Sequence, residues 1–383
     1  MRDHDLIVYG ATGFTGRLVA EYCVERKLER WAMAGRSRAR LEAVRDAIGA
    51  PADTPLIVAE ADDPAALAAL AASTRAVITT VGPYQLHGAP LVAACAAAGT
   101  GYLDLCGEPA WMRQMIDAHQ AAAQASGARI LFSCGFDSIP FDLGVLTLQD
   151  CALAQHGRPA PRVKGRVRAM QGGFSGGTAA SLKATLAAAA RDPSILGLLA
   201  NPFALTPGFS GPHQPTGLFP EFDATLNTWV APFIMAAINT KNVHRTNFLL
   251  GHRYGTDFVY DEMVVAGLGE MGKAAAEAIA KLNPLLGKGP QPGEGPSKAE
   301  RDAGHYDLLF VGLIPDGTRL DAVVTGDRDP GYGSTSRMIV ETALCLLDRE
   351  GETVGGVWTP AALLGTALRD RLQARAGLGF TAG

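Results

Sequence analysis

The sequence predicts an α/β protein with a doubly wound parallel sheet, followed by a second α+β domain with a mixed or antiparallel sheet. Over the first third of the chain, short apolar segments of strand length alternate with segments whose apolar residues recur at helical spacing. A glycine-rich turn joins the first strand to the first helix. Such alternation requires a parallel sheet covered on both faces, the arrangement of an NAD(P)-binding Rossmann domain.

The predicted elements of the first part follow one another closely. Strands are expected at residues 5–9, 31–35, 56–59, 76–80, 102–105 and 129–133, and helices at 14–26, 38–48, 62–72, 90–98 and 109–126. We therefore assign residues 1–145 to the nucleotide-binding domain.

The pattern changes in the second part, residues 146–329. Residues 162–170 alternate basic and mostly apolar side chains, as a half-exposed strand does. The turn residues 315–318 separate two apolar runs, 306–314 and 320–325, and predict a hairpin. Helices are expected to end near residue 190 and to span 335–347, the second being the final helix of the chain.

Charge and cysteine usage exclude several classes of protein. The net charge of −4 leaves no broad basic surface for nucleic acid. The six cysteines are scattered without zinc-ligand spacing, which predicts no metal site and a reducing compartment. The chain runs directly into a strand without a signal peptide, and no window is apolar enough to span a membrane. We expect a cytoplasmic protein.

Residues 9–17 read YGATGFTGR and form the strand-to-helix turn. The first N–H groups of a helix lack partners within the helix, and the helix dipole adds partial positive charge there. Gly10, Gly13 and Gly16 would let the backbone approach a pyrophosphate. The alternative is a tight turn that binds nothing, but the alternation that follows favours a dinucleotide site.

The end of the second strand indicates which dinucleotide binds. NAD sites place a carboxylate there for the ribose hydroxyls, whereas this strand ends with Arg36. A guanidinium suits the 2′-phosphate of NADP by its charge and its forked donors. Ser37 could donate to the same phosphate or cap the next helix, and a solvated basic turn is the alternative for both. We predict NADP rather than NAD.

Ligands of a doubly wound sheet bind beyond the carboxyl ends of its strands. Gly82 and Pro83 follow the fourth strand and Asp137 follows the sixth, so we expect them to contact the ribose or the nicotinamide. Residues 105–108 close the fifth strand at the same edge. Asp137 with Ser138 could instead begin a helix.

Nine stretches in this order resemble the saccharopine dehydrogenase-like oxidoreductase family, especially its branch of mycobacterial-type trans-acting enoyl reductases. They are VYGATGFTGR, AGRSRARL, TTVGPYQLHG, YLDLCGE, CGFDSIPFDLG, GGFSGGT, NTKNVHRTN, DPGYGSTSRM and GVWTPAALLG. The resemblance runs nearly end to end. It implies an NADP-type Rossmann domain to which residues 330–383 return, and a substrate-binding and dimerisation domain at 146–329.

The resemblance also implies a function. Enzymes of this branch reduce a carbon–carbon double bond of a polyketide chain held by a synthase that lacks its own reductase. It implies NADPH as the cofactor, a small-molecule or carrier-bound acyl thioester as the substrate, a polyketide synthase as a partner, and a homodimer. The implied cofactor residues are the glycines and the arginine named above, with Thr12, Phe14 and Thr15 lining the same loop.

Enoyl reduction needs a hydride at the β-carbon, a proton at the α-carbon and stabilisation of the carbonyl oxygen. No tyrosine is followed four positions later by lysine, so the pair typical of short-chain reductases is absent. The candidate acids are Tyr84 and His87, beside the predicted cofactor edge. The alternatives are that Tyr84 stacks on a neighbour and that His87 is a surface residue.

A second glycine-rich stretch opens a helix of the second domain. Ser175, Gly176, Gly177 and Thr178 carry N–H groups that could hold a thioester oxygen or a phosphate. A close helix-packing turn would explain these glycines equally well.

Two other functions are open. A saccharopine-type amino-acid or imine dehydrogenase would need converging Arg or Lys side chains, which GGFSGGT and GPYQLHG lack. A non-catalytic protein would bind NADP and a partner without turnover. The apolar stretches 229–238 and 263–286 could line a pocket or touch a lipid surface, although core or dimer interface is the simpler account.

Overall fold

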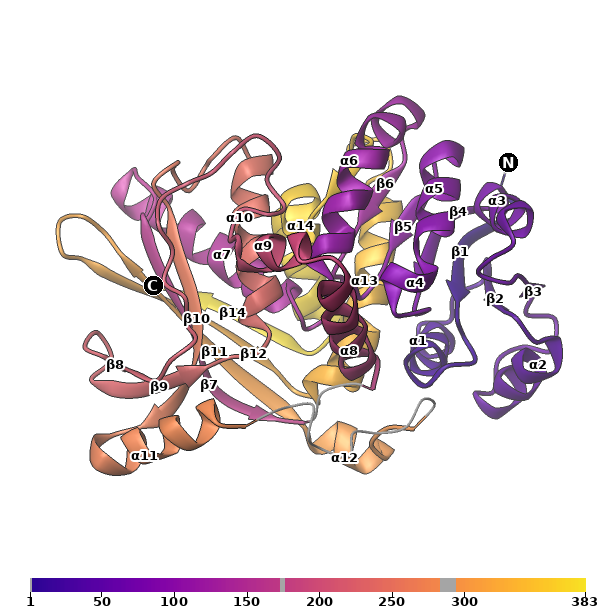
Figure 1. The fold of residues 1–383 in the computed structure, drawn as a ribbon. Helices are drawn as coiled ribbons and strands as arrows, with labels where there is room; N and C mark the ends of the chain where they lie inside the picture. The colour runs from indigo at the N-terminus through magenta and orange to yellow at the C-terminus, as the bar shows by residue number, and fades with distance from the viewer. Residues whose placement is uncertain (1, 173–175, 283–293) are drawn as a thin grey trace.

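The computed structural model describes residues 2–172, 176–282 and 294–383. This part of the chain forms two seven-stranded sheets that lie side by side (Figure 1). The first sheet is built from the N-terminal third of the chain and one late strand, and the second from the remainder. The predicted fold class, a Rossmann sheet followed by a second α+β domain, is confirmed.

The first sheet has the strand order β3-β2-β1-β4-β5-β6-β13, and all its pairs are parallel. Ile7 in its centre lies opposite Ala32 on one side and Val77 on the other. Its strands read as nearly continuous apolar runs because both faces are buried. They are β1 (His4–Tyr9), β2 (Trp31–Gly35), β3 (Leu56–Val58), β4 (Thr74–Thr79), β5 (Gly101–Leu103), β6 (Arg129–Leu131) and β13 (Gly356–Trp358).

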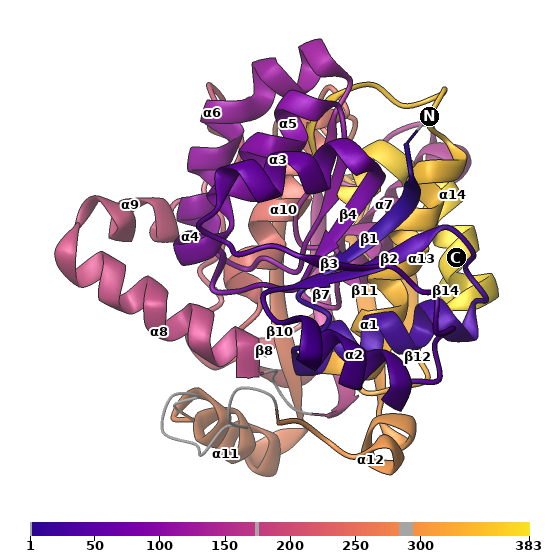
Figure 2. The same ribbon diagram turned by 90° about the vertical axis from the view of Figure 1, so that its right-hand side faces the viewer.

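Helices cover both faces of this sheet (Figure 2). One face carries α1 (Phe14–Glu25), α2 (Arg38–Ala47) and α13 (Thr335–Asp348), and the other carries α3 (Pro64–Ser73), α5 (Ala89–Ala98) and α6 (Pro109–Ser126). Their ends follow from the sequence. Asp63 accepts hydrogen bonds from the Ala65 and Ala66 amides to cap α3, and left-handed Gly99 and Gly127 end α5 and α6.

The second sheet is mixed, with β7 and β10 parallel and the other pairs antiparallel. Three helices, α7 (Ile139–His156), α10 (Ala236–Leu249) and α14 (Pro360–Arg375), pack on it and on one another. The proposed boundary at residue 145 falls inside α7. In sheet order the strands are β14 (Leu378–Ala382), β12 (Arg319–Gly326), β11 (His305–Leu313), β7 (Arg162–Gln171), β10 (Val259–Gly267), β9 (Thr228–Pro232) and β8 (Glu221–Asp223).

Two sequence predictions are wrong in this part of the molecule. The helix at 335–347 is not the final one, because β13, α14 and β14 follow it. These elements gave weak signals: β13 has only three residues, and Gly365 interrupts α14 with non-helical dihedral angles. The C-terminal segment adds one strand to each sheet and so joins the two halves of the molecule.

The predicted strand at 162–170 forms as β7, but its half-exposed pattern fails at Arg166. Arg166 is 1% exposed and forms ion pairs with Asp223 at 2.9 Å and Asp261 at 2.7 Å. Lys164 reaches Asp223 at 2.8 Å. Arg166 is therefore buried against acids of β8 and β10 instead of facing solvent, while Lys164 is half-buried.

The shorter helices lie around this core. They are α4 (Tyr84–His87), α8 (Gly176–Arg191), α9 (Ser194–Ala200), α11 (Gly269–Ala280), α12 (Lys298–Ala303) and the π-helical turn η1 (Pro330–Ser334). The apolar stretch 229–238 forms β9 and the approach to α10, and the stretch 263–286 forms the end of β10 and α11, with its last residues outside the described part.

Candidate cofactor and substrate site

The three glycines of the first turn serve three different purposes. Gly10 has φ +89°, a backbone conformation that other residues rarely adopt. A Cβ on Gly16 would lie 2.1 Å from the Gly10 carbonyl oxygen, so only glycine allows α1 to approach β1 this closely. A Cβ on Gly13 would meet nothing nearer than 3.4 Å. Gly13 is exposed and leaves the backbone open to a ligand.

The start of α1 fits a pyrophosphate. Gly13 is its N-cap residue, no side chain of the described residues caps it, and its first turn contains no acid. By contrast, Ser37 and Asp63 cap the next two helices of the domain. The first N–H groups of α1 therefore stay free for an anion, which the helix dipole also favours. Thr12 and Thr15 are half-buried beside this turn.

Phe14 links the glycine turn to the end of the chain. Its ring packs edge-on against Tyr332 of η1 with 4.8 Å between centroids, and the Arg301 guanidinium of α12 lies 5.8 Å from the ring centre. Residues late in the sequence thus cover the turn.

Arg36 follows β2, the position at which we predicted contact with the 2′-phosphate of NADP. It is exposed, and its guanidinium forms no hydrogen bond or ion pair with any described residue. Its neighbour Arg38 pairs with Glu42 at 3.3 Å. Ser37 accepts a long hydrogen bond of 3.4 Å from the Arg40 amide and caps α2, which supports the capping alternative. Its hydroxyl hydrogen remains available to a phosphate.

Hydrogen bonds join the loops at the carboxyl edge of the first sheet. We call these loops, residues 80–84, 105–108 and 134–138, the rim. The Thr80 hydroxyl donates to the Gly10 carbonyl at 3.3 Å, and the Ser133 hydroxyl to the Cys106 carbonyl at 2.5 Å. The Phe136 amide donates to the Thr335 hydroxyl at 3.0 Å, just after η1. The predicted loops after β4, β5 and β6 therefore lie together with the glycine turn.

Tyr84 is built into this rim. Its hydroxyl donates to the Thr79 carbonyl at 3.2 Å and accepts from the Leu105 amide at 3.1 Å. Its ring stacks on Trp111 with centroids 5.9 Å apart. Burial, with the nearby charge of Asp104, raises the pKa of Tyr84 well above its usual range. This geometry favours the stacking alternative, and the acid role stays a prediction.

The other predicted residues after β4 are accessible. His87 is exposed at the end of α4 and forms no side-chain hydrogen bond with a described residue. Gly82 is exposed and Pro83 half-buried, immediately before α4. A ligand beyond β4 could reach all three.

Glu108 connects the rim to helix α8, a role that the sequence did not reveal. Its carboxylate accepts hydrogen bonds from the Tyr84 amide at 2.9 Å and the Gln85 amide at 2.8 Å. It also accepts one from the Ser181 hydroxyl of α8 at 2.6 Å, and Gln85 donates to Thr185 at 3.1 Å. Helix α8 therefore lies across the gap between the two halves of the molecule (Figure 1).

The predicted thioester loop begins α8. Ser175 lies outside the described residues. The Gly176 amide donates to the Tyr332 hydroxyl at 2.9 Å, so this N–H group is already used within the protein and supports the packing alternative. Gly177 is exposed and Thr178 half-buried. Their role in binding substrate stays a prediction.

Asp137 stands in the turn after β6 and is half-buried. Burial raises the pKa of this carboxyl to about 7. The next residue, Ser138, has φ +146°, which is rare for any residue except glycine. The Ser138 hydroxyl accepts from the Asn242 amide nitrogen at 2.6 Å and donates to the Asn239 oxygen at 3.2 Å.

The network behind Ser138 continues into the second sheet. Asn239 donates to Glu262 at 2.9 Å, and the Tyr260 hydroxyl reaches the same carboxyl at 2.8 Å. Burial raises the pKa of Glu262 to about 8. The sequence contained one signal for this network: the polar run NTKNVHRTN, which forms the middle of α10 and is almost entirely buried.

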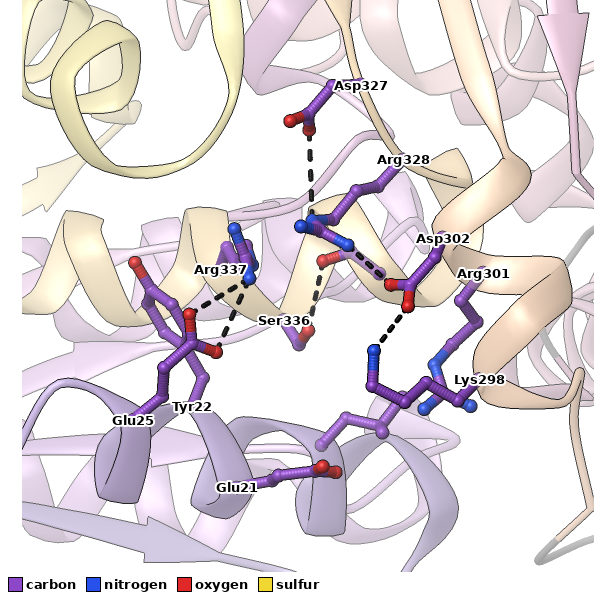
Figure 3. A pocket seen from close by; sticks show the side chains of 12 residues that line it. Glu21, Tyr22, Glu25, Lys298, Arg301, Asp302, Asp327, Arg328, Ser336 and Arg337 are labelled. Atoms are coloured by element: carbon purple, nitrogen blue, oxygen red, sulfur yellow. Dashed lines mark hydrogen bonds and ion pairs between the residues drawn. The ribbon is translucent and has the colours of Figure 1, made fainter.

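A hollow of about 660 Å³ lies between α1, α12 and α13 (Figure 3). Ion pairs cross it, including Arg337–Glu25 at 3.0 Å and Arg328–Asp302 at 2.5 Å. Its acids and bases balance, and no predicted site residue lines it. Its lining residues are Leu18, Glu21, Tyr22, Glu25, Lys298, Arg301, Asp302, Asp327, Arg328, Gly333, Ser336 and Arg337.

Comparison with known proteins agrees with this geometry. Residues 6–131 match the saccharopine dehydrogenase NADP binding domain. A Mycobacterium tuberculosis protein, provisionally named a trans-acting enoyl reductase, is 41% identical over 97% of this chain and 96% of its own. The trans-acting enoyl reductase of Mycobacterium leprae is 36% identical over the same shares.

The chain belongs to the saccharopine dehydrogenase-like family. Within it, the chain falls in the branch of the mycobacterial trans-acting enoyl reductases. The predicted family, its oxidoreductase character and NADP as the cofactor are thereby confirmed.

Solved structures of this fold support the architecture. A saccharopine dehydrogenase of Saccharomyces cerevisiae aligns over 99% of both chains with a TM-score of 0.54 and 10% identity. A homospermidine synthase of Legionella pneumophila, solved with NAD, aligns over 99% of this chain and 91% of its own with a TM-score of 0.56 and 10% identity. At such identity the likeness concerns the fold alone.

Residues 2–172, 176–282 and 294–383 also bear on membrane and metal binding. No helix in this part of the chain is both long and apolar enough to cross a bilayer. No group of three or more His, Cys, Asp or Glu side chains there could hold a metal ion.

Proposed function

We propose that this oxidoreductase uses NADPH to reduce the carbon–carbon double bond of an enoyl thioester. The observation that carries the proposal is the match at 36–41% identity along 97% of the chain to proteins named trans-acting enoyl reductases. The words 'trans-acting' in the names of these relatives suggest a substrate carried by a separate synthase. We therefore propose a carrier-bound acyl chain as the substrate and a polyketide synthase as the partner.

The charges of the rim support this substrate class over an amino-dicarboxylate. The loops at 80–84, 105–108 and 134–138 contain no Arg or Lys. Their charged residues are the acids Glu108 and Asp137, with Asp104 immediately after β5. An amino-dicarboxylate would need cations here, because a buried carboxylate without a partner is strongly disfavoured.

The residues present fit NADP. The glycine turn and the free start of α1 would hold the pyrophosphate, and Arg36 the 2′-phosphate. NADPH bound there would supply the hydride. The rim would place the thioester beyond β4, β5 and β6, with α8 as a cover that excludes water.

The test is a comparison of substrates with the purified protein and NADPH. A medium-chain trans-enoyl thioester of N-acetylcysteamine should drive NADPH oxidation and yield the saturated thioester. Glutamate with an aminoaldehyde, the substrate pair of a saccharopine-forming enzyme, should not. Turnover of the amino-acid pair alone would indicate a saccharopine-type dehydrogenase. NADPH binding without any turnover would indicate a cofactor-sensing protein.

A further inference from the structure

The turn after β6 presents a carboxyl group that none of the described residues binds. No described residue forms a hydrogen bond or an ion pair with the Asp137 side chain. This half-buried carboxyl lies at the cofactor edge of the sheet and is free of bonds to the described residues, so a ligand there could reach it without displacing one of them.

The buried proton-bearing groups in and beside the rim, on Tyr84, Glu108 and Asp104, are already engaged. The Tyr84 hydroxyl donates to the Thr79 carbonyl. Glu108 accepts bonds from two amides and one hydroxyl. The Asp104 carboxylate accepts from the Cys106 and Ser133 amides and from the Tyr102 hydroxyl. Each would have to break internal bonds to serve a substrate, whereas Asp137 would not.

The position of Asp137 is fixed from behind. The hydrogen bonds of Ser138 to Asn239 and Asn242 hold the turn in its rare left-handed conformation. Strained conformations of this kind persist where the surroundings over-determine them, typically at functional sites. On the other side of the turn, the bond from Phe136 to Thr335 ties it to η1, whose Tyr332 packs on Phe14 of the glycine turn.

We propose that Asp137 is the proton donor of the reduction, an inference that rests on the proposed function. The β-carbon of the enoyl thioester takes a hydride from NADPH, which leaves as NADP⁺. The π electrons of the double bond move to form an enolate on the carbonyl oxygen. The α-carbon then takes the proton of the Asp137 carboxyl, and the remaining carboxylate regains a proton from water. This role differs from a hydrogen bond to the nicotinamide or ribose.

The test compares wild type with Asp137→Asn, which keeps the size of the side chain but cannot donate an acidic proton. Two quantities are measured: the NADPH dissociation constant by tryptophan fluorescence, and the rate of NADPH oxidation with the trans-enoyl thioester. We expect a rate at least about 100-fold lower, the usual contribution of a general acid. The NADPH dissociation constant should stay within about twofold of wild type, because a proton donor to the substrate does not hold the cofactor.

The matched control is Asp142→Asn, the same change five residues later at a carboxyl that the Thr246 hydroxyl already binds at 2.6 Å. It should retain the wild-type rate and affinity. In Asp137→Ala, added formate should restore part of the rate by replacing the missing acid. An unchanged rate in Asp137→Asn, or an NADPH affinity that falls in step with the rate, would overturn the assignment. A wild type that reduces no enoyl thioester would instead contradict the proposed function itself.

Discussion

At the residue scale, the clearest prediction concerns Arg36, whose guanidinium has no partner among the described residues. Arg36→Ala should weaken NADPH binding about 10- to 100-fold, because a hydrogen bond to a charged group contributes about 1.5–3 kcal/mol. NADH binding should not change. Tryptophan-fluorescence titrations measure both. Arg38→Ala is the control, since Arg38 is engaged with Glu42. Equal loss of NADPH and NADH affinity would show that Arg36 does not bind the 2′-phosphate of NADPH.

Some residues of the candidate site could be predicted from the sequence and others could not. Gly10, Gly13 and Gly16 were predictable because a turn between a strand and a helix has local requirements. One partner of the Tyr84 hydroxyl was not predictable, because it is the backbone of Leu105 on a different loop. The partners of Ser138 were not predictable either, because Asn239 and Asn242 lie more than a hundred residues away in the sequence. The first contact depends on how β4 and β5 pair, and the second on how α10 packs against the turn after β6.

At the element scale, α8 is held over the rim by side-chain bonds rather than by a buried apolar face; of its described residues only Ala189 is buried. Ser181→Ala should therefore loosen α8 without unfolding the protein. Hydrogen–deuterium exchange should become faster in residues 176–191, while the midpoint of thermal unfolding stays nearly unchanged. Lys183→Ala, an exposed position on the same helix, should change neither. Unchanged exchange in Ser181→Ala would mean that the Glu108 contact does not hold α8.

A second element-scale prediction concerns the joint between α1, α13 and α14. Glu341 of α13 is fully buried and binds Arg26 at 2.6 Å, Arg371 at 2.7 Å and the Tyr22 hydroxyl at 2.9 Å. Glu341→Ala should lower the free energy of unfolding by about 3 kcal/mol, at the low end for a broken buried pair because both arginines are partly exposed. Chemical denaturation measures it. A loss below about 1 kcal/mol, the range of surface pairs, would contradict this account.

At the whole-molecule scale, buried carboxyls should make stability depend on pH. Burial raises the pKa of Asp142 and of Glu262 to about 8. Both carboxyls therefore favour the protonated form in the folded state. Their stabilising contribution to the free energy of unfolding is fully present below the ordinary carboxyl pKa near 4. It is lost as the pH rises through about 8.

Glu262→Gln tests this dependence, because the amide keeps partners in Asn239 and Tyr260 and does not titrate. The midpoint of thermal unfolding should fall less between pH 5 and pH 8 in the variant than in wild type, a range set by the pKa shift. Glu300→Gln changes an exposed carboxyl of α12. In this variant the unfolding midpoint should fall between pH 5 and pH 8 as much as it does in wild type. If the unfolding midpoint falls equally with pH in wild type and in Glu262→Gln, the claim that burial raises the pKa of Glu262 is contradicted.

The sequence predicted the order of most elements but not how the halves are joined. Local patterns identified the parallel sheet, the hairpin at 306–325 and α13 because each satisfies its own periodicity. They could not identify the final elements, since β13 pairs with β6 and β14 with β12 across long chain separations. The burial of Arg166 likewise depends on acids supplied by β8 and β10.

Reduction of an enoyl thioester by NADPH is tested most directly by isotope transfer. The protein would be incubated with a trans-enoyl thioester of N-acetylcysteamine and NADPH that carries deuterium at both hydrogen positions of nicotinamide C4, and the product examined by mass spectrometry and NMR. We predict a saturated thioester that carries a single deuterium, at the β-carbon. Deuterium at the former carbonyl carbon, an unlabelled product or no product at all would contradict the assignment.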